Sequence, residues 1–329
     1  MPFSSGIWRP DDYGALTRSL TILVMTTGST AYTERTVTVR DGVRLAVRDQ
    51  GPSDAEATVV LLHGLCLEQG SWAGQIRDLT RRWGSRIRVI SYDHRGHGTS
   101  DTAPTHTYAV EQLAADLADV LAALDVTGPL TLVGHSMGGM VALAYLGRPQ
   151  ADRPVEPHGV VLVATAAGRL AEHGVARLLA SPATDILCKF ATRAPQRAVR
   201  LLTKPVRAAM ALQVGEHARA TLAALVDTAM AAASLTTAVG FLPSLRSYDQ
   251  YATLASIRAR TTILSGGADL LTPPSHSDDL AAAIPGAEHV HLPTAGHMLP
   301  HEASHAVTHA ISRTIRAGTD ADLVHARAA

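Results

Sequence analysis

Short apolar runs alternate with amphipathic stretches along most of the chain. The amphipathic stretches have the helical period, most clearly at residues 71–82 and 108–124. The apolar runs are rich in β-branched residues and have the length of buried strands, at residues 58–62, 89–92, 130–133, 160–163 and 261–265. Residues 288–293 alternate between apolar and polar positions, as in a half-buried strand. Strands that alternate with helices in this way predict an α/β fold, in which helices cover both sides of a mostly parallel sheet.

The N-terminal part of the chain follows a different pattern. Thr36–Val39 is predicted to be a strand, and it is followed by Asp41-Gly42, a dipeptide typical of β-hairpin turns. The apolar run Leu20–Met25 is too short for the core of a signal peptide. We therefore expect residues 1–30 to be a disordered extension. A second hypothesis is that translation starts at Met25.

The charge balance and the cysteine content exclude several classes of protein. The 29 basic and 29 acidic residues cancel, so the chain has no basic footprint for nucleic acid and no polybasic patch for membranes. No apolar run approaches the ~20 residues of a membrane-spanning helix. The two cysteines, Cys66 and Cys188, are too few for a disulfide framework and favour a cytoplasmic location. At 329 residues the chain has room for one large domain, with or without an insertion.

Gly134-His135-Ser136-Met137-Gly138 is the strongest candidate for a catalytic motif. It fits the pattern G-x-S-x-G and lies between the predicted strand 130–133 and an Ala-rich helix that begins at Met137. In hydrolases a strained turn between strand and helix lifts such a serine hydroxyl above the sheet edge, and the glycines let strand and helix approach closely. An ordinary glycine-rich connection between a strand and a helix would fit the same pentapeptide. Other residues must therefore show whether the motif is catalytic.

Two residues nearer the C-terminus supply the chemistry that a serine nucleophile needs. Asp269 follows the predicted strand 261–265 and a Gly-Gly turn, and His297 follows the predicted strand 288–293. A serine hydroxyl is a weak nucleophile at neutral pH, so a histidine must take its proton and a carboxylate must orient that histidine. The three residues are therefore candidates for a catalytic triad.

The chain order serine, acid, histidine, with each residue just beyond a strand, resembles that of the serine-type α/β-hydrolase family. Two further segments carry the resemblance. Thr58–Leu65 is similar to the strand and His-Gly loop that supply half of the family's oxyanion hole. Asp93–Ser100 is similar to the D-x-R-G-x-G-x-S turn of the esterase, lactonase and haloperoxidase-like branches. The resemblance covers most of residues 36–316.

The resemblance implies a set of site residues and a reaction. Ser136 would be the nucleophile, His297 the general base and Asp269 the acid, and the backbone N–H groups of Leu65 and Met137 would bind the oxyanion. The implied reaction is hydrolysis of a carboxylic ester or lactone through an acyl-enzyme intermediate, with no metal and no organic cofactor. Ser136 argues against the dehalogenase and epoxide-hydrolase branches, which use an aspartate at this position.

The resemblance also implies a division into a core and a cap. After the strand 160–163 the alternation stops, and residues 166–257 carry helical stretches that prolines such as Pro243 are expected to interrupt. In the family such an insertion is a helical cap over the active site. We therefore expect a cap at 166–257 and a core formed by 31–165 and 258–329. The aliphatic side chains of the cap favour a substrate with a hydrophobic acyl or alcohol group.

Other functions fit the same residues. A haloperoxidase-like perhydrolase or a carbon-carbon bond hydrolase would keep the same triad, and a noncatalytic small-ligand receptor could be built on the same fold. The intact serine, acid and histidine count against the receptor. The sequence leaves the physiological substrate and the oligomeric state open.

Several conspicuous residues outside the triad are expected to be structural. Asp93 precedes the serine motif in the chain, so we assign it to turn geometry and to an ion pair with Arg95. Cys66 lies near the His-Gly loop, but it is not surrounded by a strand-turn-helix motif of the kind that surrounds Ser136. It is therefore expected to be a small buried residue. One set of histidines recurs every four residues and is expected on a solvated helix face, and a second set within the motifs is expected to make supporting hydrogen bonds. The first set is His301, His305 and His309, and the second is His63, His94, His97 and His135.

Overall fold

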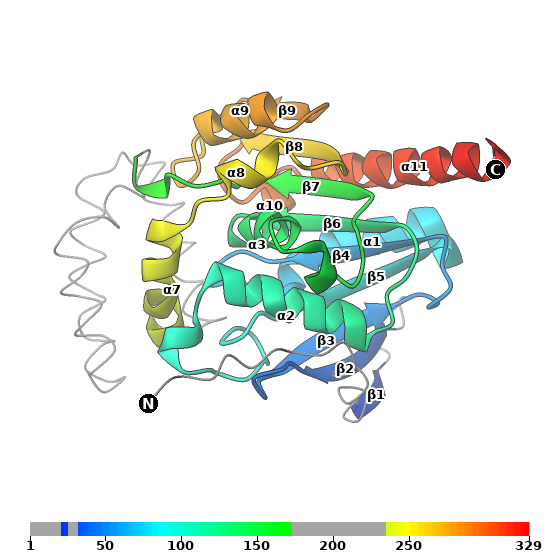
Figure 1. The fold of residues 1–329 in the computed structure, drawn as a ribbon, viewed down its shortest axis with the longest axis horizontal. Coiled ribbons are helices and arrows are strands. Elements are labelled where there is room, and N and C mark those ends of the chain that lie inside the picture. Colours follow the sequence, from blue (N-terminus) through cyan, green and yellow to red (C-terminus); the bar gives the residue numbers. More distant parts are fainter. Residues whose placement is uncertain (1–20, 26–31, 173–234, 329) are drawn as a thin grey trace, which may run out of the picture.

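A mixed sheet of strands organises the molecule. The computed structural model describes residues 21–25, 32–172 and 235–328, and within them nine strands form one sheet in the order β1-β2-β3-β5-β4-β6-β7-β8-β9 (Figure 1). Neighbours from β1 to β5 in this order pair antiparallel, and neighbours from β5 to β9 pair parallel. The strands are β1 (Thr21–Met25), β2 (Tyr32–Thr38), β3 (Arg44–Gln50), β4 (Ala57–Leu62), β5 (Ile87–Tyr92), β6 (Leu130–His135), β7 (Gly159–Val163), β8 (Arg260–Gly266) and β9 (Glu288–Leu292). The predicted α/β fold with a mostly parallel sheet is confirmed.

Helices close the sheet on both faces. α2 and α3 pack on one face, and α1 and α11 pack on the other (Figure 1). The described helices are α1 (Ala73–Trp83), α2 (Val110–Ala123), α3 (Met137–Leu146), α7 (Leu235–Ser247), α8 (Tyr251–Leu254), α9 (Pro274–Ala283), α10 (Leu299–Glu302) and α11 (Ser304–Ala328). In the part of the chain that the structure describes, no helix has both the length and the apolar character needed to cross a membrane.

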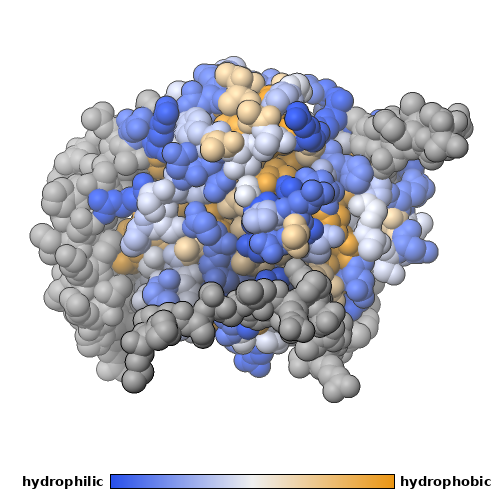
Figure 2. All heavy atoms as spheres, viewed as in Figure 1, coloured by the Kyte–Doolittle hydropathy of each residue, from blue (hydrophilic) through white to orange (hydrophobic). Residues whose placement is uncertain are grey.

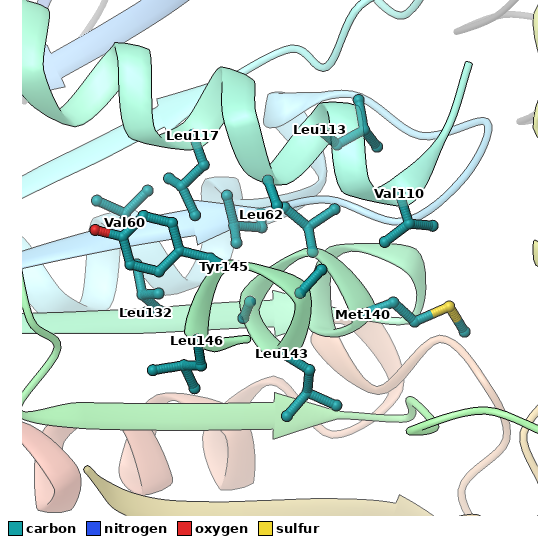
Figure 3. Close-up of a cluster of buried hydrophobic side chains, with 14 of the residues drawn as sticks. Val60, Leu62, Val110, Leu113, Leu117, Leu132, Met140, Leu143, Tyr145 and Leu146 are labelled. Atoms are coloured by element: carbon teal, nitrogen blue, oxygen red, sulfur yellow. The ribbon is translucent and has the colours of Figure 1, made fainter. Parts of the chain in front are cut away.

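Alternation of side chains along the strands creates the two hydrophobic cores. In β4, Val60 and Leu62 join the core beneath α2 and α3, whereas Val59 and Leu61 join the core beneath α1 and α11. Figure 3 shows the first of these cores, in which Val60, Leu62 and Leu132 of the strands meet side chains of α2 and α3. Strands β4 to β7 are buried along their whole length, as in a sheet covered on both faces.

The N-terminal strands extend the antiparallel side of the sheet. Gly42 has a φ of 87° between β2 and β3, as the predicted Asp41-Gly42 turn requires. Within the segment 1–30, for which the sequence predicts disorder, Thr21–Met25 forms β1 and pairs antiparallel with β2. The prediction is wrong for this run, because apolar and β-branched residues can pair with the open edge of β2. The rest of the segment lies outside the described residues.

Between β7 and β8 the chain leaves the sheet, and within this segment Gly168 and Asp249 pair with each other in an isolated antiparallel β-bridge. Residues 173–234, which hold most of the predicted cap, lie outside the described residues. The described helix α7 runs through Pro243, so the predicted interruption there is wrong. A proline removes one N–H donor and bends a helix without having to end it. Figure 1 shows α7 beyond the arrowhead of β7, on the side where the parallel strands end.

The surface in this view is mainly polar. Figure 2 shows hydrophilic residues over most of the described surface, with hydrophobic residues in small areas between them. Among the described residues, Leu270 is the one large hydrophobic residue that is exposed, with 42% of its surface accessible. Leu270 directly follows Asp269, the predicted acid of the triad.

Candidate active site

Ser136 lies in the sharp turn that joins β6 to α3. Its φ is 52° and its ψ is −119°, a backbone conformation that few residues other than glycine adopt. A Cβ on Gly134 would lie 2.3 Å from the carbonyl oxygen of Gly138, and a Cβ on Gly138 would lie 2.1 Å from the carbonyl oxygen of Leu62. Both positions therefore require glycine. The strand-turn-helix context that the sequence predicts around this serine is present.

The structure brings the three predicted triad residues together. Ser136 Oγ lies 3.0 Å from Nε2 of His297, and Nδ1 of His297 lies 2.8 Å from Oδ2 of Asp269. The serine follows β6, the aspartate follows β8 and the histidine follows β9, so three separate loops meet at the carboxyl ends of the parallel strands. Asp269 and His297 are buried, whereas Ser136 is half-buried. The hydroxyl is thus accessible while the histidine-carboxylate pair is shielded from water.

Asp269 is held as a carboxylate by donors from its own loop. The N–H groups of Leu271 and Thr272 donate to Oδ1 at 2.8 and 3.0 Å, and the Thr272 hydroxyl donates to Oδ2 at 2.8 Å. Burial raises the pKa of Asp269, but the charge and hydrogen bond of His297 and the bonds from Thr272 outweigh burial, so the pKa is lowered from its usual value. Sequence reasoning missed Thr272. The available signal was the D-x-x-T spacing, in which an aspartate accepts bonds from residues just after it.

His135 and Glu302 fix the backbone on both sides of the His297 side chain. Nε2–H of His135 donates to the carbonyl of His297 at 2.8 Å, which matches the supporting role expected from the sequence. Glu302 accepts from the N–H of Gly296 at 2.5 Å and from the N–H of Met298 at 3.0 Å. Sequence reasoning missed Glu302, because a carboxylate at the end of a one-turn helix gives no specific signal. A loop held at consecutive residues keeps the imidazole aligned with the serine.

The two predicted oxyanion donors come from two segments that lie close to Ser136. Met137 is the first residue of α3, where the helix terminus adds positive potential. Leu65 lies on the loop after β4, and this loop is close to the elbow, since a Cβ on Gly64 would lie 3.2 Å from Cβ of Ser136. Within the described part of the chain, neither the N–H of Leu65 nor that of Met137 has a hydrogen-bond acceptor. Both groups are therefore available to a developing negative charge.

Asp93 and Arg95 do not pair with each other, so this prediction is wrong. Asp93 accepts from the N–H of Gln69 at 2.8 Å and from the N–H of Thr99 at 2.9 Å. Arg95 instead donates from Nε and Nη2 to Asp116 of α2, at 2.7 and 2.6 Å. The two side chains leave the turn in different directions, and proximity in the sequence did not reveal the partner on α2. The structural role assigned to Asp93 by turn geometry agrees with these contacts.

Side chains that could suggest other chemistry are accounted for by their surroundings. His301, His305 and His309 are exposed on α10 and α11, as expected for a solvated helix face. Among the residues that the structure describes, no three His, Cys, Asp or Glu side chains are arranged to hold a metal ion. Cys66 is half-buried rather than fully buried, and burial of its thiol raises the pKa to about 12, so it stays protonated at neutral pH.

Mild acid is expected to destabilise the fold, because several motif histidines are buried in their neutral forms. Burial lowers the pKa of His63 to about 4 and those of His97 and His135 to about 3, from an ordinary value of 6.5. Below pH 6.5 the unfolded chain therefore binds protons that the folded chain does not. The free energy of unfolding keeps its full value above this pH. Below this pH, each such histidine lowers the free energy of unfolding by about 1.4 kcal/mol per pH unit, until the pH reaches the pKa of that histidine in the folded protein.

Melting temperatures measured from pH 8 down to the limit of solubility test this expectation. We expect the melting temperature to be steady above neutral pH and to fall progressively below it. The variant His135→Gln, which removes one of the titrating rings, should show a shallower fall. A melting temperature of the wild type that stays constant from neutral pH to pH 5 would contradict the assignment of neutral buried histidines.

Comparisons with known proteins agree with this architecture. A protein-family model described as alpha/beta hydrolase fold matches residues 57–304. The chain is 35% identical over 128 residues to cis-3-alkyl-4-alkyloxetan-2-one decarboxylase of Xanthomonas campestris pv. campestris. This match covers 37% of this chain and 41% of that protein. The chain is 38% identical over 117 residues to 3-oxoadipate enol-lactonase 1 of Acinetobacter baylyi, which covers 36% of this chain and 41% of that protein. These matches span about two fifths of each relative's length.

A solved structure extends the similarity over most of the chain. The crystal structure of the enol-lactonase from Burkholderia xenovorans LB400 aligns with a TM-score of 0.65 and 26% sequence identity. The alignment covers 85% of this chain and 99% of that chain.

Proposed function

Because the chain belongs to the alpha/beta hydrolase family, we propose that it hydrolyses carboxylic esters or lactones with Ser136 as the nucleophile. The observation that carries the proposal is the chain of hydrogen bonds from Ser136 through His297 to Asp269. Similarity to two enol-lactonases supports the same class of substrate. In this proposal His297 is the general base, Asp269 is the acid that orients His297, and the N–H groups of Leu65 and Met137 bind the oxyanion.

The first half of the reaction forms an acyl-enzyme. Nε2 of His297 takes the proton of the Ser136 hydroxyl as Oγ attacks the carbonyl carbon of the substrate. Asp269 keeps the other proton on Nδ1 and stabilises the imidazolium. The N–H groups of Leu65 and Met137 donate to the carbonyl oxygen as it becomes an oxyanion. His297 then gives its proton to the leaving alkoxide, the carbon-oxygen bond breaks, and the acyl group remains on Ser136.

The second half returns the enzyme to its starting state. His297 takes a proton from water, the hydroxide attacks the acyl carbon, and the same oxyanion donors stabilise the second tetrahedral intermediate. Release of the acid restores the Ser136 hydroxyl with the proton held by His297. With a lactone the alcohol that leaves in the first half stays attached to the acyl group, so the product is a single hydroxy acid.

Leu270 is expected to contribute to recognition of an apolar group. It is an exposed large hydrophobic residue directly after the buried acid Asp269. Contact of a long acyl chain with Leu270 would bury apolar area that a short chain leaves in water. We expect Leu270→Asn to lower kcat/KM for p-nitrophenyl octanoate by about tenfold more than for p-nitrophenyl acetate.

The measurement for Leu270 is the ratio of kcat/KM for the two esters in the wild type and in each variant. Leu270→Met keeps the apolar volume and serves as the matched control, so its ratio should stay near that of the wild type. An equal loss with both esters in Leu270→Asn would mean that Leu270 does not contact the acyl chain. The cap at 166–257, which is a prediction from the sequence, would then be the remaining candidate for chain-length selection.

A substrate panel tests the proposed function. Purified protein is assayed with p-nitrophenyl esters from acetate to decanoate and with a series of lactones, with product acid followed by titration. We expect turnover of at least one class, with a preference for substrates that carry an apolar group. The panel is repeated with hydrogen peroxide in place of water as the acyl acceptor, since a perhydrolase would keep the same triad. Absence of turnover with every substrate would favour a ligand receptor on the same fold. The cytoplasmic location expected from the cysteine content stays a prediction.

A further inference from the structure

The loop that carries Leu65 is hydrogen-bonded to a neighbouring turn. We call residues 63–69 the oxyanion loop and residues 93–100 the support turn. At the start of the loop, Nε2 of His63 accepts a backbone N–H of the support turn at 2.9 Å. At the end of the loop, the N–H of Gln69 donates to the first carboxylate of the support turn at 2.8 Å. Both ends of the oxyanion loop are therefore fixed to residues that follow β5.

The middle of the oxyanion loop is held in a strained conformation. Cys66 has a φ of 61°, in the left-handed region that side chains other than glycine rarely occupy. The N–H of Cys66 donates to Nε2 of His97 at 3.1 Å. This N–H belongs to the peptide group immediately after Leu65, so its hydrogen bond to His97 fixes the backbone beside the proposed oxyanion donor. Without that bond the loop could relax from the strained conformation.

The ring of His97 is set up to accept at Nε2. Nδ1 lies 3.0 Å from the carbonyl oxygen of Arg95, and a carbonyl can only accept, so Nδ1 carries the ring proton. Nε2 is then an unprotonated lone pair, as its bond from the Cys66 N–H requires. The residue is 1% exposed, and burial together with His63 lowers its pKa to about 3, which keeps Nε2 unprotonated at neutral pH.

We propose that His97 is a positioning residue for the oxyanion hole, which acts by holding the Cys66 N–H and thereby the orientation of the Leu65 N–H. The proposal rests on the proposed function, because it assigns the Leu65 N–H to the oxyanion. It gives the support turn a part in catalysis although none of its side chains is assigned to the reacting atoms. The ring of His97 does not touch the substrate in this assignment.

Loss of the acceptor at position 97 is expected to slow the chemical step. In His97→Phe an aromatic ring is kept beside the ring of Phe241, which lies 5.8 Å away between centroids, but the Cys66 N–H has no acceptor. A displaced Leu65 N–H weakens binding of the oxyanion more than binding of the neutral ester. We expect kcat for p-nitrophenyl butyrate to fall about 10- to 100-fold with KM changed less than about threefold.

A pair of amide variants separates the two bonds of the ring. In His97→Gln the side-chain oxygen can reach the position of Nε2 and accept from Cys66, so we expect recovery of at least a third of the wild-type kcat. In His97→Asn the shorter side chain can reach only the carbonyl of Arg95, so kcat should stay as low as in His97→Phe. This pair decides the proposal even if His97→Phe fails to fold.

Ser100→Ala is the matched control on the same turn. The Ser100 hydroxyl donates to the Asp93 carbonyl at 2.6 Å and accepts from the Ala46 N–H at 2.9 Å, so it faces β3 rather than the oxyanion loop. We expect Ser100→Ala to lower the melting temperature and to leave kcat within about twofold of the wild type. A loss of kcat in Ser100→Ala as large as in His97→Phe would show that any damage to the turn slows the reaction, and would overturn the proposal.

Binding of 1,1,1-trifluoro-2-butanone adds a readout that a purely structural role would not move. This ketone forms a tetrahedral adduct with an active serine, and the adduct oxygen occupies the oxyanion hole. We expect its inhibition constant to rise in His97→Phe by about the factor by which kcat falls. An unchanged inhibition constant and an unchanged kcat in folded His97→Phe would overturn the proposal. Failure of the proposed function itself is distinct, because the wild type would then hydrolyse none of the esters.

Discussion

Replacement of Ser136 by alanine is expected to abolish ester hydrolysis while leaving the fold intact. The hydroxyl is the attacking group in the proposed reaction, and the members of a triad act as a unit, so His297 and Asp269 cannot compensate. We expect kcat to fall on the order of 10⁶-fold, to the residual rate that substrate binding and the oxyanion hole supply. His297→Ala should lose nearly as much. Steady-state kinetics with p-nitrophenyl butyrate measure both losses.

The fold is the control for this prediction. The backbone carbonyl of Ser136 accepts bonds from the N–H groups of Gly139 and Met140 and from the Thr165 hydroxyl, and none of these needs the serine side chain. Alanine also has a Cβ, so the unusual backbone conformation at φ 52° is neither relieved nor worsened. The melting temperature of Ser136→Ala should therefore stay close to that of the wild type. Substantial hydrolysis by a purified and folded Ser136→Ala sample would refute the assignment of the nucleophile.

Asp269→Asn is expected to lower turnover by about 10⁴-fold with a small effect on stability. The amide NH₂ would donate to Nδ1 of His297 and keep the ring proton on Nε2, where it blocks acceptance of the serine proton. The amide oxygen can still accept the N–H bonds of Leu271 and Thr272, so the loop keeps its shape. Kinetics and thermal melting of the same preparation provide the two readouts.

Asp93→Asn is the matched comparison, because Asp93 is also a buried aspartate just after a strand. Its two oxygens accept backbone N–H groups from Gln69 and from Thr99, so an amide in either orientation sets an NH₂ against an N–H donor. An unsatisfied buried donor costs about 1–3 kcal/mol, so the expected result is a lower melting temperature with most of the turnover retained. A thermally unchanged and inactive Asp93→Asn, beside an active Asp269→Asn, would reverse the assignment.

Local sequence patterns predicted the parts of the fold and of the site that depend on residues close in the chain. Local patterns of apolar residues predicted the parallel strands and the helices α1 and α2, because a buried strand and an amphipathic helix each leave such a pattern. The helix α3 was predicted instead from the Ala-rich sequence that follows the serine motif. Ser136, Asp269 and His297 could each be recognised because each follows a strand. The parallel topology then brings the ends of β6, β8 and β9 to one edge of the sheet.

The features that the sequence did not reveal depend on which residues meet in space. Arg95 pairs with Asp116 rather than with its neighbour Asp93, and Glu302 holds the loop of His297, although neither partner has a distinctive spacing. The strand Thr21–Met25 is short, and its pairing with β2 is a tertiary contact that its own composition does not specify. The cap expected at 166–257 stays a prediction from the resemblance.

Labelling with a fluorophosphonate is the measurement that tests the central claim most directly, since the reagent phosphonylates only a serine that a base has activated. Wild-type protein is treated with increasing amounts of reagent, hydrolysis of p-nitrophenyl butyrate is followed, and the modified residue is located by peptide mass spectrometry. We predict a single adduct on Ser136, with activity lost in proportion to labelling and with no adduct in Ser136→Ala. An adduct on a different residue, or undiminished hydrolysis by fully labelled protein, would contradict a Ser136 nucleophile activated by His297 and Asp269.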